Sequence, residues 1–351
     1  MNEFEKYEFD LKGYLLVKGV LDRDTAAKCL AVCDALEQRV VSTIDAEPHF
    51  IGHYGLRYHY DQELGCSSYQ TNHGGGGEQF VVDDFLNVDP AFDALVGHEP
   101  TMSYLRQMMV GPVKIIGSEL RYRQKGNITG THMGGPIDAR NRYLFVGRPQ
   151  TNSSQSREED VAFDLLNVRL IYALHDLPSE NGALCVVPGS HKANLHSPYG
   201  SDPTKEPGMV TIPMEPGDAL FFTENLRHGG YPNTMDRTRK TLHLCFGPSW
   251  VGSQSPAHYD GVPHVTEKAW ARYNEEQRKL LPYPSPMRGV DESMAGSNAG
   301  DQAIRRLRAE IDMLTQKNSE LEQRNRKLSG GLHALMAAAT GALDRAFRRG
   351  N

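Results

Sequence analysis

The feature that most constrains the fold is a series of short apolar runs between residues 112 and 250. They are rich in β-branched and aromatic residues, and turn-forming Gly, Pro, Asn and Asp separate them: VKIIGSELRYR, LLNVRLIYALHDL, ALCVVPGS, GMVTIPM, DALFFTE and KTLHLCFG. Amphipathic helix patterns do not interrupt the series, which is typical of a sandwich or jelly roll. We therefore expect a mainly β protein with flanking helices.

A helix is predicted on the N-terminal side of this series. Residues 9–20 read as a short strand-like run, and Asp22 or Asp24 can then cap a helix that continues to about Val41. Its apolar face would carry Ala27, Leu30, Leu36 and Val40. The helix also contains Cys29 and Cys33, which we interpret as small buried apolar residues, because two ligands alone make a poor zinc site.

Two further segments flank the apolar runs. Residues 50–80 are polar, aromatic and rich in glycine, and we interpret them as a long loop. Residues 265–281 read as a helix that Pro282 ends.

Composition excludes several classes of function. The chain has 38 Lys and Arg against 44 Asp and Glu, a net charge of −6, which argues against a nucleic-acid polymer or an anionic membrane as partner. No window approaches 18 consecutive apolar residues, so a membrane-spanning helix is not expected. The five cysteines are too few and odd in number for a disulfide framework. We expect a reduced, cytoplasmic protein.

A heptad pattern marks the C-terminal part of the chain. Residues 291–300 form a linker, and residues 301–329 place Ile304, Ile311, Asn318 and Asn325 at a and Leu307, Leu314, Leu321 and Leu328 at d. Ile at a with Leu at d favours a parallel two-stranded coil, and Asn at a fixes its register, so we expect a homodimer. The alternative is an amphipathic helix that packs on the globular domain of residues 1–290. Residues 330–351 read as a short amphipathic tail.

Two histidines and an arginine stand out beside the apolar runs. His132 follows a strand-like run in THMGGPID, and His228 follows DALFFTE in the segment ENLRHGGYPN. Arg239 opens the next run, 11 residues after His228. Two histidines from different strands suit a non-haem iron site, and the arginine fork matches the distal carboxylate of 2-oxoglutarate.

At this point the sequence resembles a known family. FDLKGYLLVKGVLDRD, NGALCVVPGSHKANL, EPGDALFFTENLRHGG and RTRKTLHLCFGP are similar to segments of the phytanoyl-CoA dioxygenase-like Fe(II)/2-oxoglutarate oxygenases, over about residues 4–250. The resemblance implies a double-stranded β-helix, a jelly-roll or cupin-like fold that uses Fe(II), 2-oxoglutarate and O2. It also implies that His132 and His228 bind iron and that Arg239 anchors 2-oxoglutarate.

The sequence departs from the family at one ligand. The family pattern is His-x-Asp, whereas this chain reads His132-Met133-Gly134, and glycine supplies no carboxylate. The same replacement marks the non-haem iron halogenases, and the chain resembles those that act on nucleotides in nucleoside-antibiotic pathways. This implies that chloride binds next to His132 and His228. It also implies chlorination of an unactivated aliphatic C–H bond of a small molecule, such as the sugar of the purine deoxynucleotide dAMP.

Two alternatives stay open at this stage. Gly134 can serve a tight backbone turn, with Asp138 or Glu119 as the replacement ligand, and the enzyme would then be a hydroxylase. A domain that binds without catalysis is the other alternative. We rank halogenation above hydroxylation, and both above a non-catalytic role, because both histidines and Arg239 are present.

Other residues are candidates for cofactor or substrate binding. Thr131 and Arg123 are candidates for holding the cofactor, and the substrate candidates are Arg121, Arg169, His53, Arg57 and His59. Arg169 lies in an apolar run, where an unpaired charge is costly, so it needs an anionic partner in the protein or in a ligand. His191 is expected to shape a turn near the site rather than to bind iron.

Overall fold

The computed structural model describes residues 1–44, 49–51, 57–71, 78–133, 145–146, 163–193, 197–249, 258, 264–282 and 284. Contacts divide the chain into Met1–Arg288 and Gly289–Asn351, and every described residue belongs to the first unit. The predicted linker, coiled coil and tail therefore lie outside the described residues. The homodimer that depends on them stays a prediction.

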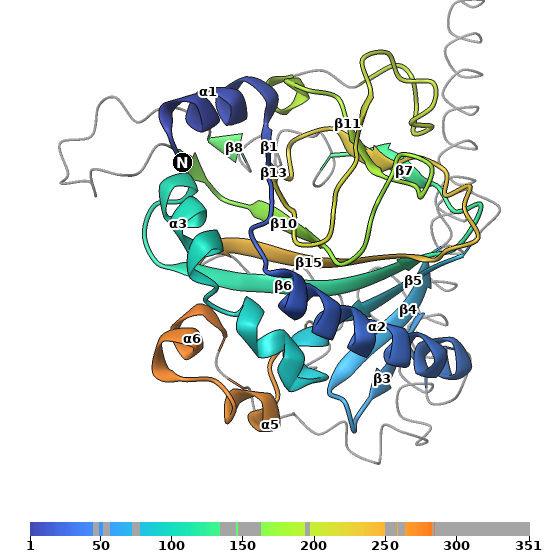
Figure 1. Cartoon of the computed structure of the whole chain (residues 1–351), viewed down its shortest axis with the longest axis vertical. Helices are drawn as coiled ribbons and strands as arrows, with labels where there is room; N and C mark the ends of the chain where they lie inside the picture. Colours follow the sequence, from blue (N-terminus) through green and yellow to red (C-terminus); the bar gives the residue numbers. More distant parts are fainter. Residues whose placement is uncertain are drawn as a thin grey trace, which may run out of the picture. The chain divides into compact units, whose positions relative to one another are not determined.

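Two antiparallel sheets form the framework (Figure 1). The nine-stranded sheet has the order β1-β13-β10-β15-β6-β5-β4-β3-β2. Its strands are β1 (Tyr14–Val17), β2 (His49–Ile51), β3 (Arg57–Asp61), β4 (Cys66–Thr71), β5 (Gln79–Asp83), β6 (Val113–Arg123), β10 (Val168–Ala173), β13 (Ala219–Thr223) and β15 (Arg239–Pro248). The four-stranded sheet has the order β12-β11-β14-β7, with β7 (Thr129–His132), β11 (Leu184–Val186), β12 (Val210–Ile212) and β14 (His228–Gly230). A separate pair joins β8 (Phe145–Val146) to β9 (Asp164–Leu165).

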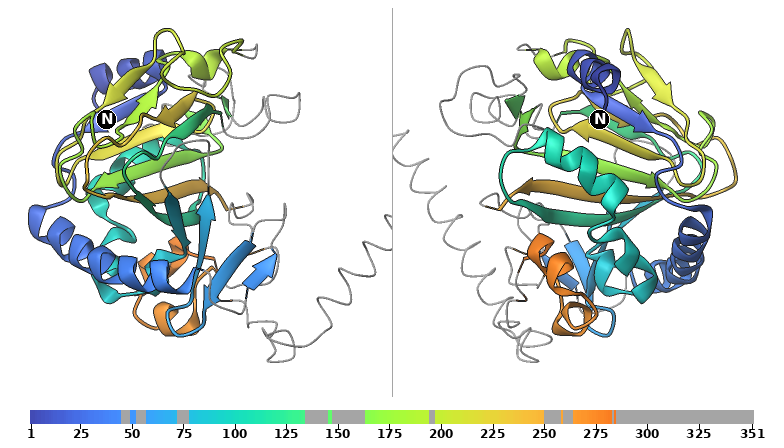
Figure 2. Two further views of the ribbon diagram at one scale, coloured as in Figure 1. Left: turned by 90° about the vertical axis from the view of Figure 1, so that its right-hand side faces the viewer. Right: turned by 60° about the vertical axis from the view of Figure 1, so that its left-hand side comes forward.

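Each of the six apolar runs contains a strand, so the predicted mainly β architecture is confirmed. The helices are α1 (Glu3–Lys12), α2 (Arg23–Thr43), α3 (Glu99–Met108), α5 (Glu267–Trp270) and α6 (Glu275–Leu280), with 3-10 turns η2 (Phe85–Asn87), η3 (Pro90–Leu95) and η5 (Ser190–Lys192). In Figures 1 and 2 the four-stranded sheet lies on one side of β6 and β15, and α2, α5 and α6 lie on the other.

The structure confirms the first predicted helix, but the set of residues that it buries differs from the predicted set. Asp22 caps α2 by accepting a hydrogen bond of 2.8 Å from the backbone N–H of Thr25. Ala27 is exposed and Leu30 half-buried, which corrects the predicted face. The buried residues are Ala26, Cys29, Cys33, Leu36 and Val40, so the two cysteines do pack as small apolar residues.

Three expectations about local structure are wrong. Residues 50–80 are not one long loop, because β2 to β5 form a meander within them that extends the large sheet. Residues 9–12 belong to α1, which a capping box of Asn2 and Glu5 begins. The segment 265–281 forms two short helices instead of one, because Asn274 caps a new helix start. In each case, polar or capping residues determined where a helix or strand begins or ends, and the spacing of apolar residues did not reveal that boundary.

Strand alternation gives the large sheet two different faces. On β10, Leu170 and Tyr172 belong to the core under the helices, whereas Ile171 and Ala173 belong to the core between the sheets. The core between the sheets contains Ile171, Ala173, Leu177, Leu184, Val186, Ile212, Met214, Leu220, Phe222 and Leu226. Each fully buried side chain of this size contributes about 1.5–3 kcal/mol. This apolar packing fixes the spacing of the sheets at one end and leaves the other end to polar residues.

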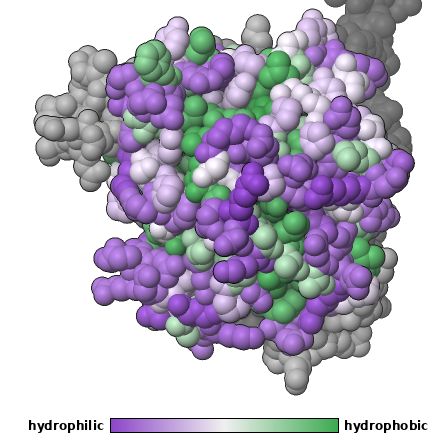
Figure 3. All heavy atoms as spheres, in the orientation of Figure 1, coloured by the Kyte–Doolittle hydropathy of each residue, from purple (hydrophilic) through white to green (hydrophobic). Residues whose placement is uncertain are grey.

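The surface carries isolated apolar side chains on a mostly polar background, and the face in Figure 3 is predominantly hydrophilic. In the part of the chain that the structure describes, no helix combines the length and the hydropathy that crossing a bilayer requires.

Candidate metal centre

His132 and His228 meet between neighbouring strands of the small sheet. They are register partners on β7 and β14, and their ring centroids are 4.2 Å apart with an interplanar angle of 54°. His228 also contacts the ring of Phe222, at 4.9 Å between centroids, and Phe222 belongs to the core between the sheets. The fold therefore brings together the two histidines that the sequence singled out, and it turns His228 toward the space between the sheets.

Backbone hydrogen bonds fix both rings in the same way. Nδ1 of His132 lies 2.8 Å from the carbonyl oxygen of Gly130, and Nδ1 of His228 lies 2.7 Å from that of Leu226. A carbonyl only accepts, so Nδ1 carries the proton in each ring and Nε2 keeps its lone pair. Donation from the other ring nitrogen to a carbonyl is the usual way in which metal-binding histidines are oriented.

Both imidazoles are held in the neutral form that binds metal ions. Burial, together with the neighbouring His132, lowers the pKa of His228 to about 3. The pKa of His132 is also lowered, mainly because the surrounding protein displaces water, although part of its surface stays open to solvent. The pair is therefore ready to bind a cation at neutral pH.

Two glycines let β14 approach its neighbours. A Cβ on Gly229 would lie 2.8 Å from the carbonyl oxygen of Thr129, and one on Gly230 would lie 2.1 Å from a guanidinium nitrogen of Arg123. A larger residue at either position would push β14 away from β7 or displace Arg123. The His-Gly-Gly sequence thus explains locally why His228 can pair with His132.

A network of buried charges lies on the inner face of the large sheet. Arg169 donates to Glu224 from Nε and to Oε1 of Glu119, at 3.0 Å, from Nη1. Arg121 donates to the other oxygen of Glu119, at 2.7 Å. Burial by itself would raise the pKa of both carboxyls, but the adjacent guanidinium groups hold the pKa of Glu119 and of Glu224 at about 2. The anionic partner that Arg169 requires is thus supplied by the protein.

Glu224 was not singled out from the sequence. Among the described residues it is the one carboxylate whose charge acts on both His132 and His228. Its signal in the sequence is weak: a single acidic residue at the end of an apolar strand, four positions before His228. Both oxygens of Glu119, by contrast, accept hydrogen bonds from arginines.

Arg239 is a buried cation without a carboxylate partner among the described residues. It is 3% exposed, Nη1 donates to the carbonyl oxygen of Gly182 at 2.7 Å, and Nε has no acceptor. Burial and the nearby Arg121 lower the pKa of Arg239 to about 10. An uncompensated buried charge is costly, so this position favours an anionic ligand.

Arg123 faces Arg239 across β6 and β15 but is bound differently. It donates to the side chain of Asn127 and to backbone carbonyls of Asn127, Gly182, Gly230 and Tyr231. These bonds give Arg123 a structural role in joining the sheets. Together Arg121, Arg123, Arg169 and Arg239 outnumber Glu119 and Glu224, which leaves two positive charges in excess beside the histidine pair.

Thr131 offers an unused hydroxyl at the same place. Its side chain is buried next to His132, and Oγ1 has no hydrogen-bond partner among the described residues. On β15, Nδ1 of His243 is also without a partner, while Nε2 contacts the hydroxyl of Thr241 at 2.9 Å. Unpaired buried polar atoms of this kind mark a position for a polar ligand.

The other residues singled out from the sequence lie elsewhere. Arg57 and His59 lie on β3, at the far end of the large sheet from β10 and β13, so they belong to a strand and not to a loop. His191 lies on η5, where Nε2 donates to the carbonyl oxygen of Asp10 at 3.1 Å, and it packs against Gly13 as a turn residue. Three residues lie outside the described part of the chain: His53, Gly134 and Asp138.

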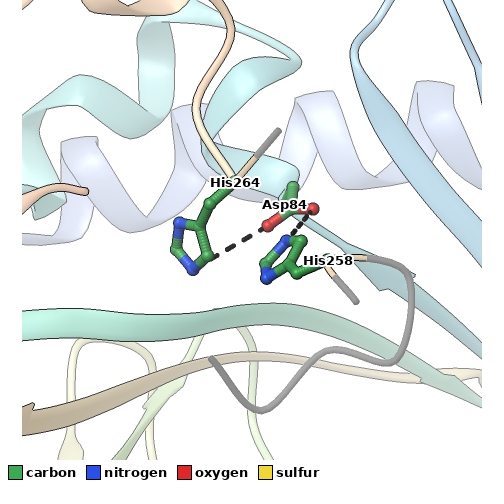
Figure 4. A group of neighbouring side chains, drawn as sticks. All are labelled: Asp84, His258 and His264. Atoms are coloured by element: carbon green, nitrogen blue, oxygen red, sulfur yellow. Dashed lines mark hydrogen bonds and ion pairs between the residues drawn. The ribbon is translucent and has the colours of Figure 1, made fainter. Parts of the chain in front are cut away.

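A second histidine cluster was missed by the sequence analysis. Asp84, His258 and His264 present ligand atoms that all lie within 4.8 Å of one another, which makes them a candidate His/His/Asp triad by composition (Figure 4). Asp84 follows β5 directly and has a positive φ of 65°. Burial raises the pKa of Asp84 to about 7. His258 and His264 lie close together in sequence, but Asp84 lies 174 positions before His258, so no local motif marks the cluster.

Comparison with known proteins agrees with this fold and chemistry. Residues 145–241 match the family model of phytanoyl-CoA dioxygenase. An iron/alpha-ketoglutarate-dependent dioxygenase of Penicillium thymicola is 40% identical over 86 residues, which cover 24% of this chain and 26% of the relative. A dioxygenase of Aspergillus terreus is 32% identical over 83 residues, which cover 24% of this chain and 28% of that one. The match thus spans about a quarter of each of these fungal relatives.

Two further proteins match a larger share of the chain at lower sequence identity. A methylphosphonate hydroxylase of Gimesia maris is 25% identical over 141 residues, which cover 37% of this chain and 53% of the relative. The structure of HygX from Streptomyces hygroscopicus with nickel, 2-oxoglutarate and hygromycin B bound superimposes with a TM-score of 0.52 at 18% identity, covering 73% of this chain and 90% of that one. This superposition supports the double-stranded β-helix fold. Over residues 145–241 the chain is thus similar to the phytanoyl-CoA dioxygenase family, and its fold is similar to that of HygX.

Proposed function

We propose that the protein oxidises an aliphatic C–H bond of a small molecule, with iron bound by His132 and His228 and 2-oxoglutarate anchored by Arg239. The proposal is supported by two register-paired histidines whose Nδ1 atoms are bound to carbonyls, and by the buried Arg239, whose Nε has no acceptor among the described residues. Arg239 and His228 both act electrostatically on His243, which links the arginine to the histidine pair. Bound Fe(II) with 2-oxoglutarate supplies the activation of O2 for C–H oxidation. The residues of the chain position the metal and the cosubstrate, balance their charge and exclude water from the site.

The charges around the histidine pair fit a dianionic cosubstrate. 2-Oxoglutarate carries two carboxylates, and the buried network has two more guanidinium groups than carboxylates. Arg239 would pair with the distal carboxylate, because its fork geometry suits bidentate binding. The unpaired hydroxyl of Thr131 is placed to donate one further hydrogen bond to the cosubstrate.

The Asp84 cluster is a weaker candidate for the catalytic iron, although its composition matches a facial triad. Among the described residues, the titratable groups recorded as acting on Asp84 are His258, His264 and Glu119, without an arginine or lysine. The described residues around it therefore provide no anchor for a dicarboxylate. We assign the cosubstrate, and with it the catalytic iron, to the histidine pair.

Hydroxylation is the outcome that we favour, because the relatives named above are dioxygenases and a hydroxylase. A carboxylate next to the histidines also supports it, since a 2-His-1-carboxylate site is typical of the oxygenases. Glu224 is our candidate for supplying that negative charge. Asp138 remains a second candidate on the basis of the sequence.

Chlorination is a second candidate function, and the glycine at position 134 favours it. A site without the aspartate of the His-x-Asp pattern has room for chloride beside the iron. A purine deoxynucleotide as substrate rests on the sequence resemblance to nucleotide halogenases. Gly134→Asp separates the two outcomes, because a new carboxylate would displace chloride and leave hydroxylation intact.

The test is an anaerobic titration of the full-length protein with Fe(II) and 2-oxoglutarate, observed in the visible charge-transfer band. We expect a saturable band in the wild type, loss of the band in His228→Ala, and an unchanged band in the control His59→Ala on β3. A band that survives in His228→Ala, or that never forms, would overturn the proposal. Addition of chloride then distinguishes the outcomes: a shift absent from Gly134→Asp supports chlorination, and an indifferent band supports hydroxylation.

A further inference from the structure

The geometry points to a second cation site, in which Asp84, His258 and His264 hold a divalent transition metal of the Zn²⁺ type. The site would be structural: it would attach the segment around residues 258–264 to the end of β5. It is separate from the histidine pair, and it does not depend on the function proposed above.

The distances between the three side chains suit one small cation (Figure 4). Nε2 of His258 lies 2.8 Å from Oδ2 of Asp84, and Nε2 of His264 lies 4.0 Å from Oδ1 of the same carboxylate. The two imidazole rings have centroids 4.5 Å apart. Tetrahedral zinc with ligands at about 2.0–2.1 Å separates its ligand atoms by roughly 3.3 Å, so movements of less than about 1 Å close the site.

The cluster contains buried polar atoms that nothing in the described chain satisfies. Asp84 is fully buried, and its Oδ1 has no hydrogen-bond partner. The ring nitrogens of His264, whose side chain is 7% exposed, also have none. A buried carboxylate oxygen and a buried imidazole that point toward each other without a bond are a costly arrangement. A cation between them satisfies both.

The backbone holds these ligands in a defined place. The N–H of Asp84 donates to the carbonyl oxygen of Ser118 on β6, at 2.7 Å. The amide of Asn87 donates to the carbonyl oxygens of Gly65 and His264, at 2.7 and 3.3 Å. The left-handed backbone of Asp84 is unfavourable for a residue other than glycine, and such conformations persist where the surroundings demand them.

Strand alternation separates this cluster from the histidine pair. Asp83 pairs with Glu119, whose side chain belongs to the inner network, and the next residue, Asp84, follows on the other face beside Ser118. On β6 the alternate residues Leu120 and Tyr122 face the helices, and the hydroxyl of Tyr122 donates to a carbonyl of α2 at 2.8 Å. The sheet therefore lies between the two clusters.

Ligand type and enclosure indicate the metal. Two imidazoles and one carboxylate are borderline-soft ligands that suit zinc and its neighbours better than Ca²⁺ or Mg²⁺, which prefer six or more oxygens. The side chains of His258 and His264 are 8% and 7% exposed, so the site is nearly closed. A water molecule would complete a four-coordinate ion.

The experiment uses the full-length His132→Ala/His228→Ala variant, which removes the other histidine pair. Stripped of metal and titrated with Co(II), it should bind one equivalent and show the intense visible absorption of a four-coordinate N/O site. Zn(II) should abolish the absorption by displacement. Adding Asp84→Asn or His264→Ala should reduce Co(II) affinity at least 100-fold, and His59→Ala should leave it unchanged.

The outcomes also separate this inference from the proposed function. Absence of tight Co(II) binding in the His132→Ala/His228→Ala variant overturns the second site, whether or not the further variants fold. If the Asp84 cluster is a structural metal site, the His264→Ala variant retains the visible band of the Fe(II)/2-oxoglutarate complex. Loss of that band in His264→Ala, together with its retention in His228→Ala, would instead place the catalytic iron at Asp84 and overturn both assignments.

Discussion

Two groups of histidines lie on opposite sides of the nine-stranded sheet, and they differ in what surrounds them. His132 and His228 lie over a face with three buried arginines, the half-buried Arg121 and two glutamates, and a neighbouring carbonyl accepts a hydrogen bond from each ring. His258 and His264 lie on the helix-covered face beside the buried Asp84, and within the described part of the chain no arginine or lysine is recorded as acting on that carboxylate. Positive charges are in excess around His132 and His228, whereas His258 and His264 have the carboxylate of Asp84 beside them.

This difference is the basis on which we propose a different metal chemistry for each group. A site that must bind an anionic cosubstrate needs unpaired cations near the metal, at a cost in stability that the ligand offsets. A site that only joins two segments needs a complete ligand set and no access. Residue types alone do not distinguish these cases, because both groups contain histidines and a nearby carboxylate.

The largest expected effect is on catalysis by the histidine pair. His228→Ala should abolish 2-oxoglutarate consumption, because a site with one protein nitrogen cannot hold Fe(II) at working concentrations. Consumption in His264→Ala should stay within about twofold of the wild type, on the view that the second cluster is structural. The assay is O2-dependent formation of succinate, and the reverse order of effects would exchange the roles of the two clusters.

A smaller but still large effect is expected at the anion anchor. Arg239→Ala removes the buried arginine that we propose as the partner of the distal carboxylate, and such a loss typically costs about 2–5 kcal/mol, or about 30- to 5,000-fold in the Kd for 2-oxoglutarate. Iron binding itself should persist. Isothermal titration with 2-oxoglutarate measures the change, and exposed Arg57→Ala on β3 is the matched control. An unchanged Kd would show that Arg239 does not bind the cosubstrate.

The charge network should give the protein a pH-dependent stability. The pKa of Glu224 is about 2 in the folded protein, below its ordinary value of 4.5, so its stabilising contribution is complete above pH 4.5 and disappears as the pH falls toward 2. Glu224→Gln should therefore lower the free energy of unfolding by about 3 kcal/mol at pH 7 and by much less near pH 3.

Urea denaturation across this pH range measures the difference between the wild type and Glu224→Gln. Glu276→Gln is a suitable control, because the side chain of Glu276 is 80% exposed and its pair with Lys279 lies at the surface. A constant difference between pH 7 and pH 3 would mean that the ionised Glu224 does not stabilise the fold.

The smallest expected effect is a loss of stability where β14 lies close to β7 and Arg123. Gly230→Ala would place a Cβ 2.1 Å from Arg123, so we expect a loss of about 1–3 kcal/mol of stability from overpacking. Gly130→Ala, whose Cβ would meet only Ser201 at 3.4 Å, should be tolerated. Thermal unfolding compares the two variants, and equal melting temperatures would remove the packing argument for the His-Gly-Gly sequence.

Part of the candidate site could be predicted from the sequence because its signals are local. Apolar alternation located the strands between residues 112 and 250, and the end of the run DALFFTE drew attention to His228, which begins β14. His132, His228 and Arg239 each begin or end a strand, where side chains can meet across a sandwich. The prediction of the β2–β5 region failed because strands at a sheet edge carry polar residues, which hide the alternation that marks a strand.

The sequence by itself indicated the strands between residues 112 and 250 and the Asp22 cap of α2, because short-range periodicity and turn residues specify them. It also singled out His132, His228 and Arg239 as candidates for the inner site. Only the tertiary structure decided the partners of the buried charges. Glu224 lies 55 positions from Arg169, and His258 lies 174 positions from Asp84. Such pairs are set by which strands become neighbours in the sheet and which face each residue takes, and no local pattern carries that information.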